Sequence, residues 1–124
     1  MALDIDQPSI GYQLGRLFAL LSKIQEESNS RINSSLVGRS YGIACSSPVS
    51  VFVPLMRLMW YQLSEIDNKE RRLQLECQVS EIMGHLNGFP VHLNLDEQGK
   101  FAIGYYHQWQ IFFIKKETQV PNQE

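Results

Sequence analysis

The sequence has little cysteine and little histidine. Cys45 and Cys77 are the two cysteines among 124 residues and show no paired spacing, so we expect reduced, buried thiols rather than a disulfide. The three histidines, His85, His92 and His107, form no recognised zinc arrangement with one another or with the cysteines. We therefore expect no metal site and no cofactor.

Long hydrophobic runs are also missing. Hydrophobic residues make up 44% of the chain, yet no run approaches the roughly 20 apolar residues that span a bilayer. The start, "MALDIDQPS", lacks the basic and apolar regions of a signal peptide. We expect a cytoplasmic protein without membrane contact. Its 124 residues suffice for a single domain over residues 1–124, with a frayed tail over residues 117–124.

Most motifs that carry catalysis are absent. The chain has no Walker loop, no G-x-G-x-x-G and no H-E-x-x-H, so nucleotide hydrolysis and metalloprotease chemistry have no residues to use. "GRSYG", residues 38–42, does match the G-x-S-x-G nucleophile elbow, and Ser40, Asp96 and His107 follow in hydrolase order. That elbow needs a buried strand before it and a parallel sheet around it, and "INSSLV" is no such strand. We therefore disfavour a small hydrolase built on Ser40, although the residues alone leave it as a third hypothesis.

Charge is distributed unevenly, although the net charge is only -2. Residues 7–64 carry five cationic side chains against two acidic ones, whereas residues 65–97 carry three against seven. The first part therefore suits an anionic ligand, and the second suits solvent or a basic partner.

Apolar residues recur at helical spacing in the first part of the chain. The three-and-four spacing from Leu14 to Ile24 predicts a helix over residues 8–27 and places Arg16 and Lys23 on its opposite face. Asp6 is a possible cap for this helix. The Ser-, Asn- and Gly-rich stretch that follows predicts a short helix near residues 32–37 and then a loop.

Helix start signals continue through the rest of the chain. Ser47 and Pro48 resemble a cap with proline in the first turn, and Pro54 then indicates either a kink or a later start. Asp67 and Glu70 imitate a capping box ahead of the next helix. That helix ends at Gly88 and Pro90, and a last helix runs from the cap Asn94 to about residue 116. Apart from the brief "PVHLNL", no stretch alternates like a strand, so we predict an all-α fold, a compact bundle of about four to five helices.

The stretch "IGYYHQWQIFF", residues 103–113, concentrates aromatic side chains in the last helix. On a helical wheel, the apolar side chains cover a wider arc than is typical of a half-buried helix. The narrow polar strip that remains contains Lys100, His107, Gln108 and Lys115. The arc comprises Phe101, Ala102, Tyr105, Tyr106, Trp109, Phe112 and Phe113. We interpret it as core packing rather than a cofactor site, with the helix either central in the bundle or covered by another chain. Gly99 and Gly104 weaken this helix, which indicates that a neighbour approaches closely there.

Scattered cations and polar side chains are the remaining candidates for a site. Guanidinium groups with hydroxyl or amide donors beside them grip phosphates without reading bases, although a solvated face has the same composition. The candidate nucleic-acid contacts are Arg16, Lys23, Arg31, Asn33, Arg39 and Arg57.

Three stretches of the chain, in order, carry a resemblance to a known family. They are "GYQLGRLFALLSKIQ", "INSSLVGRSYGIACSSPVSVFVPLMRL" and "FPVHLNLDEQGKFAIGYYHQ". Together they resemble the C-terminal region of the large subunit of type I-C CRISPR Cascade, an RNA-guided DNA surveillance complex for antiviral defence. In that family the region is also made as a free small subunit from an internal start, and Met1 lies just ahead of the first stretch. The chain therefore looks like that small subunit.

The resemblance implies a non-catalytic helical bundle that assembles with the backbone and large subunits of Cascade and with other copies of itself. It would help hold the displaced DNA strand and the duplex of crRNA with target DNA in the R-loop, because base pairing reads the sequence and the protein supplies cationic, shape-matched contacts. In the family an arginine commonly follows "GYYHQ", whereas Trp109 stands here, which favours packing against a protein neighbour. The alternative is a purely protein–protein bridging module without nucleic-acid contact.

Overall fold

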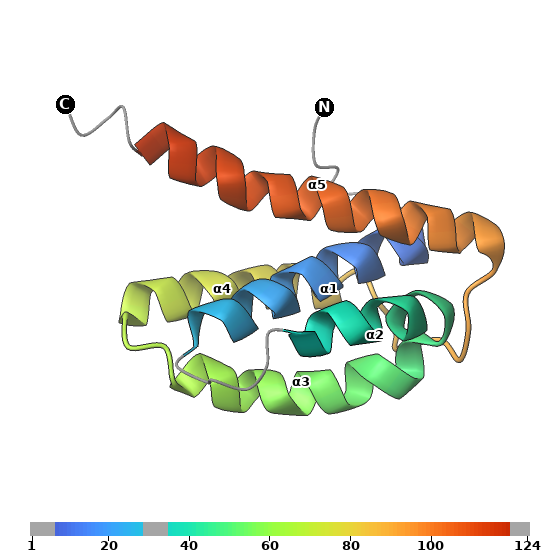
Figure 1. Ribbon diagram of the computed structural model, residues 1–124, viewed down its shortest axis with the longest axis horizontal. Coiled ribbons are helices and arrows are strands. Elements are labelled where there is room, and N and C mark those ends of the chain that lie inside the picture. Colours follow the sequence, from blue (N-terminus) through green and yellow to red (C-terminus); the bar gives the residue numbers. More distant parts are fainter. Residues whose placement is uncertain (1–6, 29–34, 120–124) are drawn as a thin grey trace.

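The computed structural model describes residues 7–28 and 35–119, and it describes side chains over residues 7–28 and 40–112. Over these ranges the chain forms five helices and no strand, so the predicted all-α bundle is confirmed (Figure 1). The helices are α1 (Ile10–Glu27), α2 (Ser35–Ser46), α3 (Pro48–Ser64), α4 (Lys69–Met83) and α5 (Leu95–Gln119).

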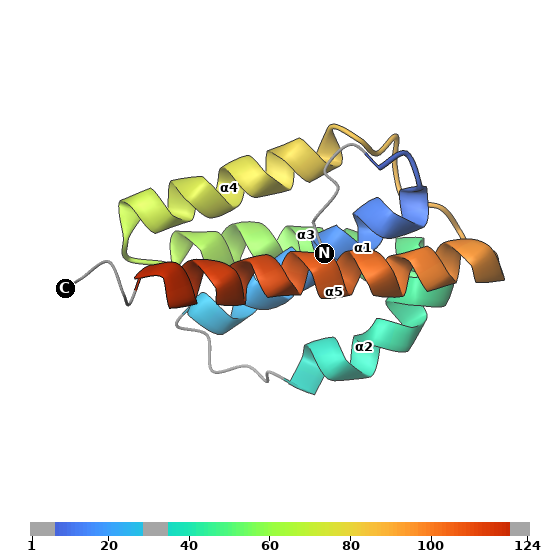
Figure 2. The same cartoon turned by 90° about the horizontal axis from the view of Figure 1, so that it is seen from above.

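Helix α1 is the centre of the bundle. α5 lies on one side of it and α3 on the other (Figure 1), while α2 and α4 flank it when the molecule is seen from above (Figure 2). The helix starts at the cap Ser9, whose hydroxyl oxygen accepts a hydrogen bond from the Tyr12 amide at 3.2 Å. The predicted cap Asp6 lies outside the described residues.

Burial on all sides of α1 corrects one sequence prediction. Because four helices surround α1, it has no broad solvent face, and Arg16 is only 2% exposed. Arg16, which we predicted on the face opposite the apolar positions, is therefore enclosed rather than open to solvent. Lys23, one turn from the end of the helix, is partly exposed.

Glycines allow α1 and α5 to pack backbone against backbone. A methyl group added to Gly11 or Gly15 of α1 would overlap the carbonyl oxygen of Glu97 or Phe101, and one added to Gly104 of α5 would overlap the carbonyl oxygen of Tyr12. The predicted close approach is confirmed at Gly104. At Gly99 it is wrong, because a methyl group there would meet none of the described atoms within 4 Å.

The aromatic arc of α5 is narrower than predicted. Phe101 and Phe112 are buried and Tyr105 and Trp109 are partly buried, whereas Ala102 is exposed and Ile103 and Tyr106 are 50% and 57% exposed. Gln108, which we expected on the polar strip, is 2% exposed because it faces α1. The side chain of Phe113 lies outside the described residues. α1, rather than α5, is therefore the central helix.

Helix α2 replaces a predicted loop. We expected a helix over residues 32–37 and a loop after it, but the helix runs from Ser35 to Ser46. Its serines and glycines are weak helix formers, and packing compensates: the Tyr41 ring lies 5.7 Å from that of Phe18 and 5.3 Å from that of Phe101, and Ala44 is fully buried.

The remaining helices start and end close to the predicted residues, with small differences. Helix α3 begins at Pro48 as predicted and continues through Pro54 rather than starting there, and Ser47 makes no side-chain cap bond. The cap of α4 is Asn68, one residue after the predicted Asp67. Helix α4 ends at Met83, ahead of the predicted stop at Gly88, which does adopt a positive φ of 133°.

The start of α5 is tied to the start of α1. Asn94 caps α5 as predicted, since its side-chain oxygen accepts a hydrogen bond from the Glu97 amide at 2.8 Å. The Glu97 carboxylate reaches across to α1, where it accepts hydrogen bonds from the Ser9 hydroxyl at 2.6 Å and the Gly11 amide at 2.8 Å. Helix α5 extends to Gln119, three residues beyond the predicted end and into the tail that we expected to fray.

Candidate nucleic-acid interface

Part of the chain contains no acidic residue at all. Residues 28–64 include three arginines and no aspartate or glutamate. Helices α2 and α3 come from this stretch, and α3 lies on the side of α1 that is opposite α5 (Figure 1). The acidic residues of positions 65–97 fall instead on α4, the start of α5 and the segments beside them. The fold thus keeps the charge asymmetry of the sequence: α2 and α3 carry no acidic residue, and the first acidic residue after them is Glu65, at the end of α3.

Arg57 is the one charged residue of α3, and it lies on an exposed face with large side chains. Val53 is 37% exposed, and Trp60 and Tyr61 are each 58% exposed. Relative to Arg57 these residues stand four positions before, three after and four after, which places all of them on one side of a helix. We call these four residues the outer face of α3. Among the described side chains, nothing forms an ion pair or hydrogen bond with the Arg57 guanidinium.

Lys23 has acidic neighbours on its own helix. Its Nζ atom lies 3.4 Å from Glu26 Oε1 and 3.9 Å from Glu27 Oε2, and it stands 5.7 Å from the centre of the Phe112 ring. Glu27 in turn accepts two hydrogen bonds from Arg71 of α4, at 2.6 and 2.8 Å. The positive charge of Lys23 is therefore largely balanced within the protein.

Arg16 is enclosed by α1, α4 and α5. Its Nη2 atom lies 2.7 Å from Glu81 Oε1, its Nη1 atom donates to Gln13 Oε1 at 2.8 Å, and its Nε atom donates to Gln108 Oε1 at 3.0 Å. The other Glu81 oxygen lies 3.0 Å from His85 Nε2. Sequence reasoning missed Glu81, Gln13 and Gln108 as the partners of this arginine.

The pKa of Glu81 reflects this enclosure. Burial acts to raise the pKa, but the hydrogen bonds and charges of Arg16 and His85 outweigh it and hold the pKa of Glu81 below its ordinary value. Glu81 therefore stays ionised and neutralises Arg16 within the fold.

The other predicted contacts are only partly described. Arg31 and Asn33 lie outside the described residues, and Arg39 lies on α2 with its side chain outside them. Of the predicted residues whose side chains are described, Arg16 faces the interior between α4 and α5, whereas Arg57 points outward from α3. The structure does not bring these two arginines together.

The letters of the hydrolase motif are not assembled into a triad. Ser40 lies within α2 rather than on a turn after a strand. The His107 Nδ1 atom lies 2.8 Å from the Tyr12 hydroxyl, and Asp96 pairs with Lys100 at 3.4 Å. The histidine and the aspartate thus have other partners, and nothing in this geometry activates a serine.

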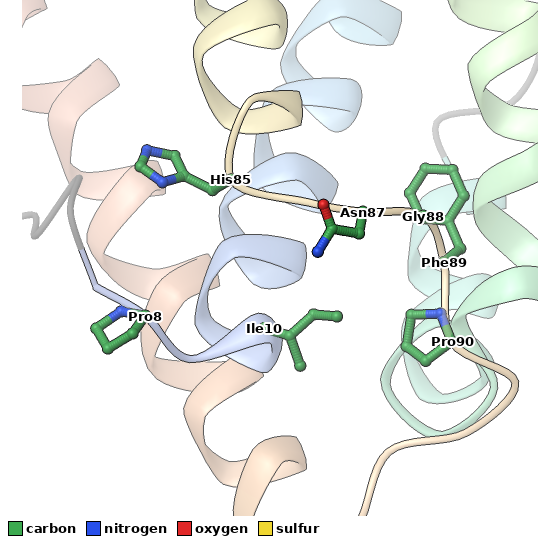
Figure 3. Close-up of a pocket in the computed structure, with 7 residues that line it drawn as sticks. All are labelled: Pro8, Ile10, His85, Asn87, Gly88, Phe89 and Pro90. Carbon is green, nitrogen blue, oxygen red and sulfur yellow. The ribbon is translucent and has the colours of Figure 1, made fainter.

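One open pocket of about 430 Å³ lies where the start of α1 meets the segment between α4 and α5 (Figure 3). His85 and Asn87 are its polar side chains, and the rest of the lining is Pro8, Ile10, Gly88, Phe89 and Pro90. None of the predicted nucleic-acid contacts lines it. Across the described ranges, moreover, no cluster of three or more histidine, cysteine or acidic side chains is placed to hold a metal ion, and no helix is long and apolar enough to cross a bilayer.

Comparison with known proteins places the chain in a family. A search of curated proteins finds no match. The family model described as "CRISPR-associated protein (Cas_Csd1)" matches residues 1–113 of the 124. This match covers all of α1 to α4 and most of α5, and therefore the acid-free stretch and the buried Arg16 as well. The chain belongs to the Cas_Csd1 family of CRISPR-associated proteins.

Proposed function

We propose that the chain is the non-catalytic small subunit of a type I-C Cascade complex, and that it steadies the opened DNA strands of the R-loop through contacts to the phosphate backbone. Membership of a CRISPR-associated family supports a role in such a complex. The observation that carries the nucleic-acid part is the acid-free stretch of residues 28–64, with Arg57 exposed and without an acidic partner among the described residues. Such a complex meets invading DNA in the cytoplasm.

The proposed contacts follow from charge and exposure. Base pairing with the guide reads the sequence in RNA-guided recognition, so the protein needs cations that face a backbone rather than groups that read bases. Arg57 meets this need on α3, and Arg31, Asn33 and Arg39 belong to the same acid-free stretch. Arg16 is left out because a phosphate would have to displace Glu81 from a buried site. Lys23 contributes less because Glu26 and Glu27 balance its charge.

Salt dependence of DNA binding by the assembled complex tests this proposal. Each phosphate contact releases a counterion, so Arg57→Ala should lower the slope of log affinity against log salt by about 1. Lys100→Ala is the matched control, because Lys100 pairs with Asp96 on α5 and should leave the slope unchanged. Unchanged slopes for alanine variants of Arg31, Arg39 and Arg57 would reject the backbone contacts.

A protein–protein bridging module is the second candidate. Helix α5 favours it, because Ile103 and Tyr106 are half exposed on the side turned away from α1. The backbone subunits, the large subunit and further copies of this chain would be the neighbours that such a module contacts. Cross-linking inside the assembled complex separates the candidates: a bridging module gives protein adducts alone, whereas the proposed function also gives adducts to DNA.

A further inference from the structure

The outer face of α3 exposes aromatic rings that the fold does not use. On the inner side of the same turns, Met59, Gln62 and Leu63 are at most 4% exposed, so the helix is firmly packed where Trp60 and Tyr61 stand out at 58%. Neither of these two rings contacts another aromatic ring among the described residues. Large exposed aromatics on a well-packed helix indicate an interaction surface.

The position of Arg57 relative to the two rings indicates which kind of partner the face fits. At about 100° per residue, Trp60 falls on one side of Arg57 and Tyr61 on the other, both one turn further along. The face therefore offers two rings at one level of the helix and a guanidinium one turn before them. A single strand of nucleic acid offers the matching groups: two successive bases and, to one side of them, the phosphate that joins their nucleotides.

Tyr61 presents its ring rather than its hydroxyl to such a ligand. The hydroxyl forms a hydrogen bond with the Glu65 carboxylate, and this bond, with the charge of Glu65, raises the pKa of Tyr61. Glu65 ends the acid-free stretch one turn after Tyr61, so a single carboxylate borders the outer face at its end. The recognition available from Tyr61 is therefore stacking on its aromatic face.

We infer that the outer face of α3 binds single-stranded nucleic acid by stacking bases on Trp60 and Tyr61 while Arg57 holds the phosphate that joins the two nucleotides. This inference rests on the proposed function and adds a reason why the chain would bind an opened strand more tightly than a duplex. In a duplex the faces of the bases are covered by their neighbours, so the rings have nothing to stack on, whereas the bases of a displaced strand are free. Trp, Tyr and Arg also anchor protein interfaces, but Arg57 belongs to a stretch without acidic residues and has no acidic partner among the described residues, so its charge suits a polyanion.

Oligonucleotide binding by the full chain tests the inference. We expect a fluorescein-labelled oligothymidylate to bind more tightly than a duplex of the same length, and Trp60→Ala to weaken single-strand binding about tenfold, as expected for the loss of one stacked base. Trp60→Phe and Tyr61→Phe keep a ring and should bind within about threefold of wild type. Tyr106→Ala removes an equally exposed ring from α5 and should change nothing.

A second readout excludes misfolding as the cause of a loss. Trp109→Phe leaves Trp60 as the only tryptophan, and its fluorescence should be quenched when oligothymidylate is added, with no change to the chain at the face itself. Absence of quenching together with full binding by Trp60→Ala would overturn the stacking inference.

The same measurements separate this inference from the proposed function. If the oligonucleotide binds with a salt slope that Arg57→Ala reduces, while Trp60→Ala has no effect, the phosphate contacts stand and stacking fails. If neither the chain nor the assembled complex responds to any of these variants, both fail. If Trp60→Ala leaves oligonucleotide binding intact but lowers co-assembly with the other Cascade subunits, the outer face of α3 docks a protein and the inference is wrong.

Discussion

Arg16 and Glu81 join α1 to α4 through an ion pair in which Nη2 and Oε1 lie 2.7 Å apart. The arginine side chain is 3% exposed and the glutamate side chain 36%, so the pair runs from the interior to the surface. The Arg16 guanidinium also donates hydrogen bonds from Nη1 to Gln13 and from Nε to Gln108. A cation that first suggested a ligand contact is thus a connection between three helices.

Removal of the charge on Glu81 should destabilise the protein. In Glu81→Gln the Arg16 charge stays buried with only neutral partners, and we expect a loss of about 1–2 kcal/mol in the free energy of unfolding at neutral pH. Glu26→Gln is the matched control, because Glu26 is 62% exposed and its pair with Lys23 should contribute no more than about 0.5 kcal/mol. Urea denaturation followed by circular dichroism measures both. Equal stability of the two variants would contradict a structural role for the buried pair.

The same carboxylate predicts a pH dependence. The pKa of Glu81 is lowered in the folded protein, so its stabilising contribution is complete above the pKa of the unfolded chain and is lost as the pH falls through the folded pKa. As the pH is lowered from about 5, the urea concentration at the unfolding midpoint of the wild type should therefore decrease. The difference in midpoint between wild type and Glu81→Gln should shrink over the same pH range. A gap that stays constant down to about pH 3 would contradict the lowered pKa.

The α1–α5 crossing should tolerate no side chain at its glycines. In Gly15→Ala and Gly104→Ala the new methyl group overlaps backbone atoms of the other helix, which move only if the helices separate, so we expect a loss of about 2–3 kcal/mol in each. Gly99→Ala is the control on the same helix: its methyl group meets nothing, and better helix propensity should add about 1 kcal/mol. Thermal or urea unfolding shows whether each variant loses or gains stability relative to the wild type. A neutral Gly104→Ala variant would mean that the helices lie further apart than described.

Helical periodicity predicted α1 and α5 well because their signals are local. The spacing of Leu14 and Ile24, like the cap at Asn94, lies within the helix that it marks. Helix α2 was missed for the opposite reason. Its own residues disfavour a helix, and the rings of Phe18 and Phe101 that hold Tyr41 come from distant parts of the chain.

The candidate site was predicted less well than the fold. Arg57 is exposed as a nucleic-acid contact requires, but Arg16 was placed on the wrong side because its partner Glu81 is 65 residues away and no local pattern links them. One signal was present in the sequence: Gly11 and Gly15 stand four residues apart, next to Arg16, and small residues at that spacing indicate a helix packed closely on that face.

The two thiols should differ in reactivity. Both cysteines are free, as predicted, but Cys77 is exposed rather than buried, whereas Cys45 is partly buried with its Sγ atom 3.6 Å from the Gln98 carbonyl oxygen. Burial raises the pKa of Cys45, so little of it is thiolate at neutral pH. A disulfide reagent such as dithionitrobenzoate should react in two phases of equal size, the faster belonging to Cys77.

Single-cysteine variants assign the phases. Cys77→Ser should abolish the fast phase and leave folding intact, because the side chain is exposed, and the remaining phase should keep accelerating as the pH passes the ordinary thiol value of about 8.5. Cys45→Ser should retain only the fast phase. If both thiols of the native protein reacted at one rate, the packing of α2 against α5 around Cys45 would be looser than its contact with Gln98 requires, and the same looseness would reach Tyr41 one turn away.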